Sequence, residues 1–138
     1  FRLMDDISAI NSDGVFENDI SEIYPSSLDL KKENVGIQSA NILDLTVDLD
    51  FDTRKFTYKL YDKRDKFKFK IVNYPDIGGN ISMQCCYGVV KSELNRYAKL
   101  SSNFSDFILR KTILFDKLRE KGYIYNRLQS IFDSIRFN

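Results

Sequence analysis

Two adjacent carboxylates, Asp5 and Asp6, lie near the start of the chain between short apolar stretches. Hard divalent cations prefer carboxylate oxygens as ligands. Two such cations, about 3.5–4 Å apart, can activate an attacking oxygen and stabilise the leaving oxygen of a phosphoryl transfer. Aspartate is also common in turns, because its side chain hydrogen-bonds the nearby backbone. The pair therefore predicts either a site for a divalent metal or an ordinary turn.

The composition excludes several other catalytic chemistries. The chain has no histidine, and its two cysteines, Cys85 and Cys86, are adjacent. Zinc sites of the His/Cys type and nucleophilic catalysis with a histidine base are therefore excluded. Adjacent cysteines rarely bridge each other, so we expect no disulfide framework and an intracellular location, in the nucleus or the cytoplasm. The apolar runs are far shorter than the ~20 residues of a membrane span, so no membrane partner is expected.

The charges are distributed unevenly along the chain. Residues 1–52 contain twelve acidic and three basic residues, whereas residues 53–138 contain eight acidic and eighteen basic ones. An acidic first part joined to a basic second part predicts a metal-binding face beside a surface for a polyanion. The alternative is solvated surface charge that is segregated by chance.

Residues 54–70 hold eight basic and only two acidic residues, interleaved with tyrosines and phenylalanines. Such a mixture is suited to phosphate contacts with some stacking on bases. The alternative is a lysine-rich strand face that discourages edge pairing. Basic residues at 99, 110, 111, 117, 119 and 121 extend the positive character onto the following helices. The predicted nucleic-acid contacts are Arg54, Lys55, Lys59, Lys63, Arg64, Lys66, Lys68, Lys70 and Arg96.

The elements that must position these residues follow from the spacing of apolar side chains. Residues 2–11 predict a β-hairpin with Asp5 and Asp6 at its bend, and residues 16–24 predict a helix that Pro25 ends. Period-two alternation predicts strands, and a polar stretch between two of them predicts a hairpin loop. The predicted strands are 28–30, 42–51, 56–60 and 66–71, and the predicted loop is 52–55.

After Asn80 the apolar residues follow a spacing of three and four, which predicts three helices. Gly122 predicts the end of the second helix, because glycine commonly caps helix C-termini. We expect a buried core thiol at Cys86 and a half-buried one at Cys85. The residues predicted to face the core are Met83, Cys86, Tyr87, Val90, Leu94 and Tyr97, then Phe104, Phe107, Ile108, Phe115 and Leu118, and finally Ile124, Leu128, Ile131, Phe132 and Ile135.

These elements together predict an α+β fold with two parts. Antiparallel strands with one packed helix are expected in residues 1–76, and a three-helix bundle in residues 77–138. The boundary falls near Pro75 to Gly79, where a turn or hinge is expected.

Several short motifs carry a resemblance to a known family. They are Leu3-Met4-Asp5-Asp6, Leu28-Asp29-Leu30-Lys31-Lys32, Ile42-Leu43-Asp44-Leu45, Phe56-Thr57-Tyr58-Lys59-Leu60-Tyr61-Asp62-Lys63-Arg64-Asp65, Tyr87-Gly88-Val89 and Arg96-Tyr97-Ala98. In this order they resemble the C-terminal half of the catalytic core of a reverse transcriptase, an RNA-directed DNA polymerase. The nearest type is a Penelope-like or related eukaryotic retroelement.

The resemblance implies that residues 1–76 are the C-terminal part of a polymerase palm with primer-grip-like strands, and that residues 77–138 are a helical thumb. It implies Asp5 as a ligand of Mg²⁺ or Mn²⁺ and Asp6 as a supporting metal carboxylate. Lys31 or Lys32 would be the cation near the leaving pyrophosphate. The implied partners are an RNA or DNA template–primer, deoxynucleoside triphosphates and the N-terminal remainder of the same polypeptide.

Two departures from the family pattern bear on activity. Leu3 stands where the family usually has Tyr or Phe, and the strand that supplies another metal carboxylate is not among these residues. The chain opens on Phe1, so we expect a piece of a longer polypeptide that is inactive alone. Two other interpretations stay open: a non-catalytic nucleic-acid-binding module derived from a polymerase-like domain, and an unrelated α+β interaction domain.

Overall fold

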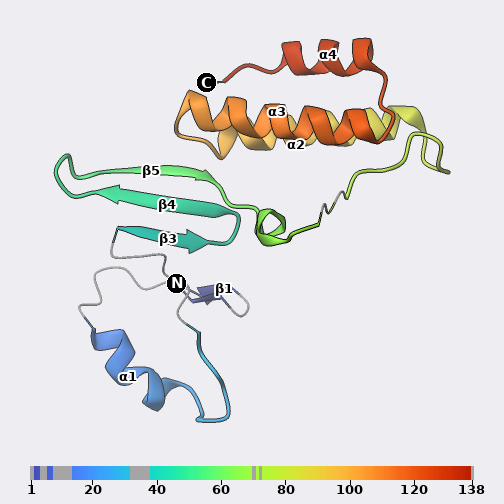
Figure 1. Cartoon of the computed structure of the whole chain (residues 1–138). Helices are drawn as coiled ribbons and strands as arrows, with labels where there is room; N and C mark the ends of the chain where they lie inside the picture. The colour runs from blue at the N-terminus through green and yellow to red at the C-terminus, as the bar shows by residue number, and fades with distance from the viewer. Residues whose placement is uncertain are drawn as a thin grey trace.

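The computed structural model describes residues 2–3, 6–7, 14–31, 38–69, 71 and 73–137. This part of the chain contains a two-stranded hairpin, a three-stranded antiparallel sheet and four α-helices (Figure 1). The predicted α+β class is therefore confirmed. Three of the helices pack together beyond one edge of the sheet, whereas the first helix and the hairpin lie beyond the opposite edge.

The hairpin at the start of the chain joins β1 (Arg2–Leu3) and β2 (Asp6–Ile7). Its antiparallel register pairs Leu3 with Asp6. A hairpin is thus confirmed within residues 2–7, while residues 8–11 of the prediction lie outside the described residues. The prediction that Asp6 lies in the bend is wrong, because its backbone already belongs to the second strand. Asp5 lies outside the described residues.

Helix α1 (Val15–Ile23) follows this hairpin and matches the predicted helix in position, but the prediction that it packs on the sheet is wrong, because α1 lies away from β3–β5 (Figure 1). Gly14 begins it with a φ of 82°, a left-handed conformation that glycine adopts at little cost. The helix ends at Tyr24, whose extended backbone is favoured before a proline.

Two predicted short strands are wrong. At residues 28–30 the backbone N–H of Leu28 donates to the Pro25 carbonyl (3.0 Å), which makes a turn, and no strand forms. The described part of residues 66–71 is irregular as well, and the rings of Phe67 and Phe69 are exposed and contact each other instead of a sheet. Short apolar–polar alternation is therefore not sufficient for a strand where no neighbouring strand pairs with it.

The sheet is a meander in the order β3-β4-β5, with β3 (Ser39–Ile42), β4 (Leu45–Asp50) and β5 (Lys55–Leu60). The predicted single strand at 42–51 is wrong, because a two-residue turn at Leu43 and Asp44 splits it. Ile42 pairs with Leu45 across this turn, and Leu43 adopts a φ of 55°. The return strand at 56–60 is confirmed, although Lys55, predicted in the loop, already begins β5.

The connection from the sheet to the bundle is a 3₁₀ turn followed by an irregular segment. The turn η1 (Lys63–Lys66) begins at Asp62, whose side chain accepts a hydrogen bond from the Arg64 backbone N–H. Further along, the backbone N–H of Gly79 donates to the Asp76 carbonyl (3.1 Å), which confirms the turn predicted there.

The three predicted helices are present as α2 (Met83–Lys99), α3 (Phe104–Glu120) and α4 (Tyr125–Ser134). Helix α3 ends at the predicted glycine, with Gly122 at a φ of 82°. The Gly122 N–H donates to the Arg119 carbonyl (3.0 Å) and the Tyr123 N–H donates to the Leu118 carbonyl (3.1 Å). These two bonds form a Schellman motif, which satisfies carbonyl groups that the helix end would leave unpaired.

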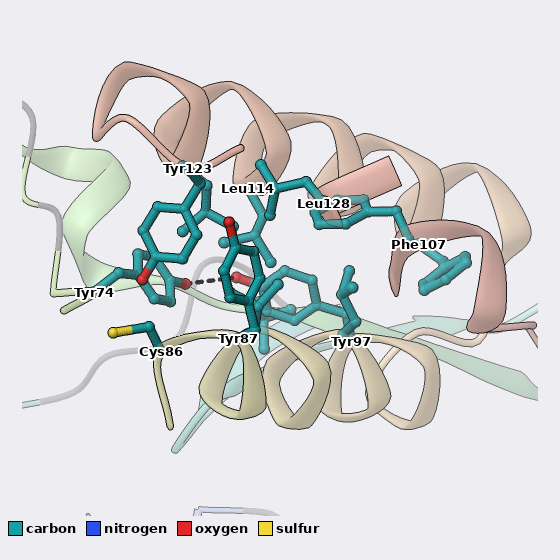
Figure 2. Packing of buried hydrophobic residues seen from close by; sticks show 13 residues of the cluster. Tyr74, Cys86, Tyr87, Tyr97, Phe107, Leu114, Tyr123 and Leu128 are labelled. Carbon is teal, nitrogen blue, oxygen red and sulfur yellow. Dashed lines mark hydrogen bonds between the residues drawn. The ribbon is translucent and has the colours of Figure 1, made fainter. Parts of the chain in front are cut away.

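The core lies almost wholly within the helical bundle (Figure 2). Of the residues predicted to face it, Met83, Phe104, Ile108 and Ile124 are exposed, and Leu114, which was not predicted, is buried. Cys86 is buried as expected, whereas Cys85 is exposed and not half-buried. Among the described residues, the buried apolar residues of this core are Leu60, Tyr74, Cys86, Tyr87, Val90, Leu94, Tyr97, Phe107, Leu114, Leu118, Tyr123, Leu128 and Phe132.

The bundle is attached to the sheet at β5. Ser102, between α2 and α3, donates its backbone N–H (2.8 Å) and its hydroxyl (2.9 Å) to the Tyr58 carbonyl. The Tyr58 N–H in turn donates to the Ser102 hydroxyl (2.9 Å), so the free edge of β5 is paired by this loop. Within the described residues, no helix has the length and apolar character needed to cross a membrane.

Candidate nucleic-acid interface

The residues predicted for metal binding and catalysis are only partly described. The backbone of Asp6 lies in β2, while Asp5 and Lys32 lie outside the described residues. Lys31 is exposed, with its Nζ 3.9 Å from the Asp29 carboxylate. No group of three or more His, Cys, Asp or Glu side chains is arranged to hold a metal in the part of the chain that the structure describes.

The polar face of the sheet carries charges of both signs. Because side chains alternate along a strand, Thr46 and Asp48 of β4 share a face with Thr57 and Lys59 of β5. Lys59 Nζ lies 3.2 Å from the Asp48 carboxylate, which also accepts a hydrogen bond from Ser39 (2.5 Å). The hydrogen bond from Ser39, together with Lys59, lowers the pKa of Asp48, so this carboxylate is ionised at neutral pH.

Four of the predicted nucleic-acid contacts are exposed and make no ion pair with another described residue. Two lie beside the β4–β5 turn, and two lie on η1 or just after it. An exposed, unpaired lysine or arginine is available to a phosphate without first breaking an internal bond. These residues are Arg54, Lys55, Lys63 and Lys68.

Two of the three predicted arginines, Arg64 and Arg96, are bound to carboxylates instead. Arg64 Nε donates to both oxygens of Asp62 (2.7 and 3.0 Å). Burial raises the pKa of Asp62, but hydrogen bonding and the charge of Arg64 outweigh it and the pKa is lowered. Arg96 donates to Glu93 through Nε (3.0 Å) and Nη2 (2.8 Å), and its Nη1 donates to Asp44 (2.7 Å). Arg96 thus connects α2 to the β3–β4 turn.

A groove of about 360 Å³ lies between the β4–β5 sheet, η1 and α3. Two of the predicted contacts, Lys59 and Lys66, line it, and Lys66 Nζ lies 5.1 Å from the centre of the Tyr61 ring. The groove therefore combines cations with an aromatic surface. Its lining residues are Thr46, Lys59, Leu60, Tyr61, Asp62, Asp65, Lys66, Asp106, Leu109 and Arg110.

Apart from Lys59 and Lys66, the residues that line the groove were not predicted as site residues. They are Thr46, Leu60, Tyr61, Asp62, Asp65, Asp106, Leu109 and Arg110. One signal for α3 was present in the sequence, because positions 106, 109 and 110 are three and four residues apart and so share one helix face. Nothing local to the sequence indicates that this face lies against β5 and η1. Lys70, also predicted as a contact, lies outside the described residues.

No protein-family model, no curated protein and no solved structure matches this chain. The resemblance to reverse transcriptases therefore depends on the sequence motifs and on the order of the elements.

Proposed function

We propose that this chain is the end of the palm and the thumb of a reverse transcriptase, and that its own task is to hold the template–primer. The observation that carries this proposal is the groove between β5 and α3, lined by Lys59, Lys66 and Arg110. Exposed basic residues on η1 and beside the β4–β5 turn supply further cations outside the groove. The order of hairpin, helix, sheet and three helices supports the same assignment.

The binding would be directed at the nucleic-acid backbone. Lysine and arginine neutralise phosphates and release the condensed counterions, which makes binding depend steeply on salt. Contacts of this kind fix the position of a duplex but do not read its sequence. We therefore expect an RNA–DNA hybrid to bind with little sequence preference.

The catalytic roles are proposed from the motifs. Asp5 and Asp6 would bind Mg²⁺ or Mn²⁺, and Lys31 or Lys32 would stabilise the leaving pyrophosphate, since phosphoryl transfer needs charge stabilisation at the departing oxygens. Magnesium requires near-octahedral coordination. Two neighbouring carboxylates do not complete it, and the described residues add no cluster of metal ligands. Further carboxylates from the N-terminal remainder of the polypeptide are needed, so the chain alone should not extend a primer.

The test is a titration of the 138-residue chain with a labelled RNA–DNA primer–template at several salt concentrations. A chain that contacts four phosphates should lose about two orders of magnitude in affinity between 50 and 200 mM salt. Equal affinity at both concentrations would contradict the proposal.

A second candidate is a non-catalytic nucleic-acid-binding module with a polymerase-like fold. Leu3 in place of an aromatic residue favours it. Primer extension with Mg²⁺ separates the two, using a chain extended at its N-terminus, with an Asp5→Asn variant as control. Extension that is lost in the variant supports the polymerase, and template–primer binding without extension supports the module.

A further inference from the structure

The charged groups that line the groove balance one another. Three are cations, Lys59, Lys66 and Arg110, and three are carboxylates, Asp62, Asp65 and Asp106. A groove with no net charge attracts a polyanion weakly, because long-range attraction depends on the summed charge. For the groove to bind a nucleic acid, some of its cations must exchange an internal partner for a phosphate.

Arg110 is the cation with the clearest internal partner. Its Nη1 donates to the Asp65 carboxylate (2.5 Å), and its Nη2 donates to the Leu60 carbonyl (3.1 Å). The first bond connects α3 to η1, across the groove that both residues line. The second bond holds the guanidinium at the end of β5. Arg110 is therefore already oriented toward the groove.

The two partners of this ion pair differ in their solvent exposure. The Asp65 side chain is 40% exposed and the Arg110 side chain is 18% exposed. Within the described part of the chain, Arg110 is the one hydrogen-bond partner of the Asp65 carboxylate. Partly exposed ion pairs contribute little to stability, so Asp65 can move into solvent at a small cost.

We propose that Asp65 is an internal competitor of phosphate, which occupies Arg110 in the free protein and is displaced when a nucleic-acid backbone enters the groove. This inference rests on the proposed function. Asp65 accepts one N–H of the guanidinium, from Nη1, and a phosphate oxygen can accept the same N–H, so phosphate replaces the carboxylate without reorienting Arg110. The exchange leaves the Leu60 bond in place. Asp65 thereby lowers affinity for nucleic acid and sets the salt range in which binding occurs.

The test compares Asp65→Asn with Asp52→Asn in the 138-residue chain. Both substitutions remove one negative charge near basic residues, but Asp52 lies in the exposed β4–β5 turn and its carboxylate contacts no base among the described residues. Affinity for the RNA–DNA primer–template is measured between 50 and 200 mM salt, and circular dichroism checks that each variant is folded. Asp65→Asn should bind about three- to tenfold more tightly. The slope of the logarithm of the binding constant against the logarithm of the salt concentration should become steeper by about 0.9, which corresponds to one extra phosphate contact.

The Asp52→Asn control should change affinity less than about twofold and leave the slope unchanged. A second comparison places Asp65→Asn in an Arg110→Ala background. There the gain should disappear, because no guanidinium remains to be released. Equal behaviour of the two single variants, or a gain that persists without Arg110, would overturn the inference.

The two proposals fail in different ways. If the unaltered chain binds in a salt-dependent manner but Asp65→Asn behaves as the control does, the competitor role is wrong and the proposed function stands. If neither the unaltered chain nor Asp65→Asn binds, both are wrong. If Asp65→Asn binds and the unaltered chain does not, the competitor role is supported.

Discussion

The helical bundle and the sheet bury their apolar side chains to very different degrees. Among the described residues, the helices and the turn between α3 and α4 supply eleven of the thirteen buried core residues, and the sheet supplies only Leu60. On the same sheet face Leu49 and Phe56 form a cross-strand pair, and Phe56 is 65% exposed. The bundle is thus stabilised by its own interior, whereas the sheet is stabilised mainly by strand pairing and by its attachment to the bundle at β5.

The difference agrees with the proposed function, in which the N-terminal remainder of the polypeptide completes the palm. It also indicates where substitutions should act. A side chain of the bundle core should matter far more for folding than one of similar size on the sheet.

The largest effect is expected from Leu94→Ala. Leu94 is completely buried between the helices, so truncation removes apolar contacts and leaves a cavity, which should cost about 3–5 kcal/mol of unfolding free energy. The matched control is Leu49→Ala on the sheet, where a partly exposed leucine should cost less than about 1 kcal/mol. Chemical denaturation followed by circular dichroism measures both. Similar losses in the two variants would remove the distinction between the regions.

A smaller effect is expected from Gly122→Ala at the end of α3. Gly122 has a φ of 82° and nothing lies within 4 Å of an added Cβ, so the cost comes from backbone conformation alone, about 1–2 kcal/mol. Gly88→Ala is a control for which the opposite change in stability is expected. Gly88 lies inside α2, and an added Cβ there also has open space around it. There alanine should stabilise by about 0.5–1 kcal/mol. Melting curves that shift in the same direction for both variants would contradict the assignment of the helix end.

The smallest effects are expected when the pH is changed, and the sheet and the bundle should lose stability at opposite ends of the pH range. In the sheet the pKa of Asp48 is lowered, so its contribution to stability is complete above the unfolded pKa of about 3.9 and is lost as pH falls through the folded value. In the bundle, burial raises the pKa of Tyr123 to about 12. Its contribution is complete below the unfolded pKa of about 10 and is lost as pH rises toward 12.

Denaturation midpoints at pH 3, 7 and 11 measure these effects. Asp48→Asn should lose less stability than the unaltered chain between pH 7 and pH 3, and the same stability between pH 7 and pH 11. Tyr123→Phe should show the reverse. Variants that follow the unaltered chain at every pH would show that neither group is linked to stability.

The helices could be predicted from the sequence because their apolar residues recur at helical spacing over several turns. In α2, Cys86, Tyr87, Val90, Leu94 and Tyr97 repeat over several turns, and all five are buried. The sheet was harder to predict. The apolar Leu43 continues the alternation through a turn, so the sequence pattern gives no sign that two strands meet there.

The groove could be predicted only in part. Lysines at 59 and 66 are visible as a basic run, but the partner of Arg110 lies 45 residues earlier in the chain. Which carboxylate meets which base depends on how α3 is placed against η1 and β5. That placement is a tertiary property, set by packing at Leu60 and by the bonds of Ser102 to Tyr58.

The central claim is that the groove between β5 and α3 holds the template–primer. Its most direct test is the dissociation constant for an RNA–DNA primer–template, measured for Lys59→Glu beside Lys91→Glu, an equal charge reversal at an exposed position of α2 outside the groove. We expect Lys59→Glu to weaken binding by about tenfold or more and Lys91→Glu by about twofold or less. Equal losses in the two variants would contradict the claim.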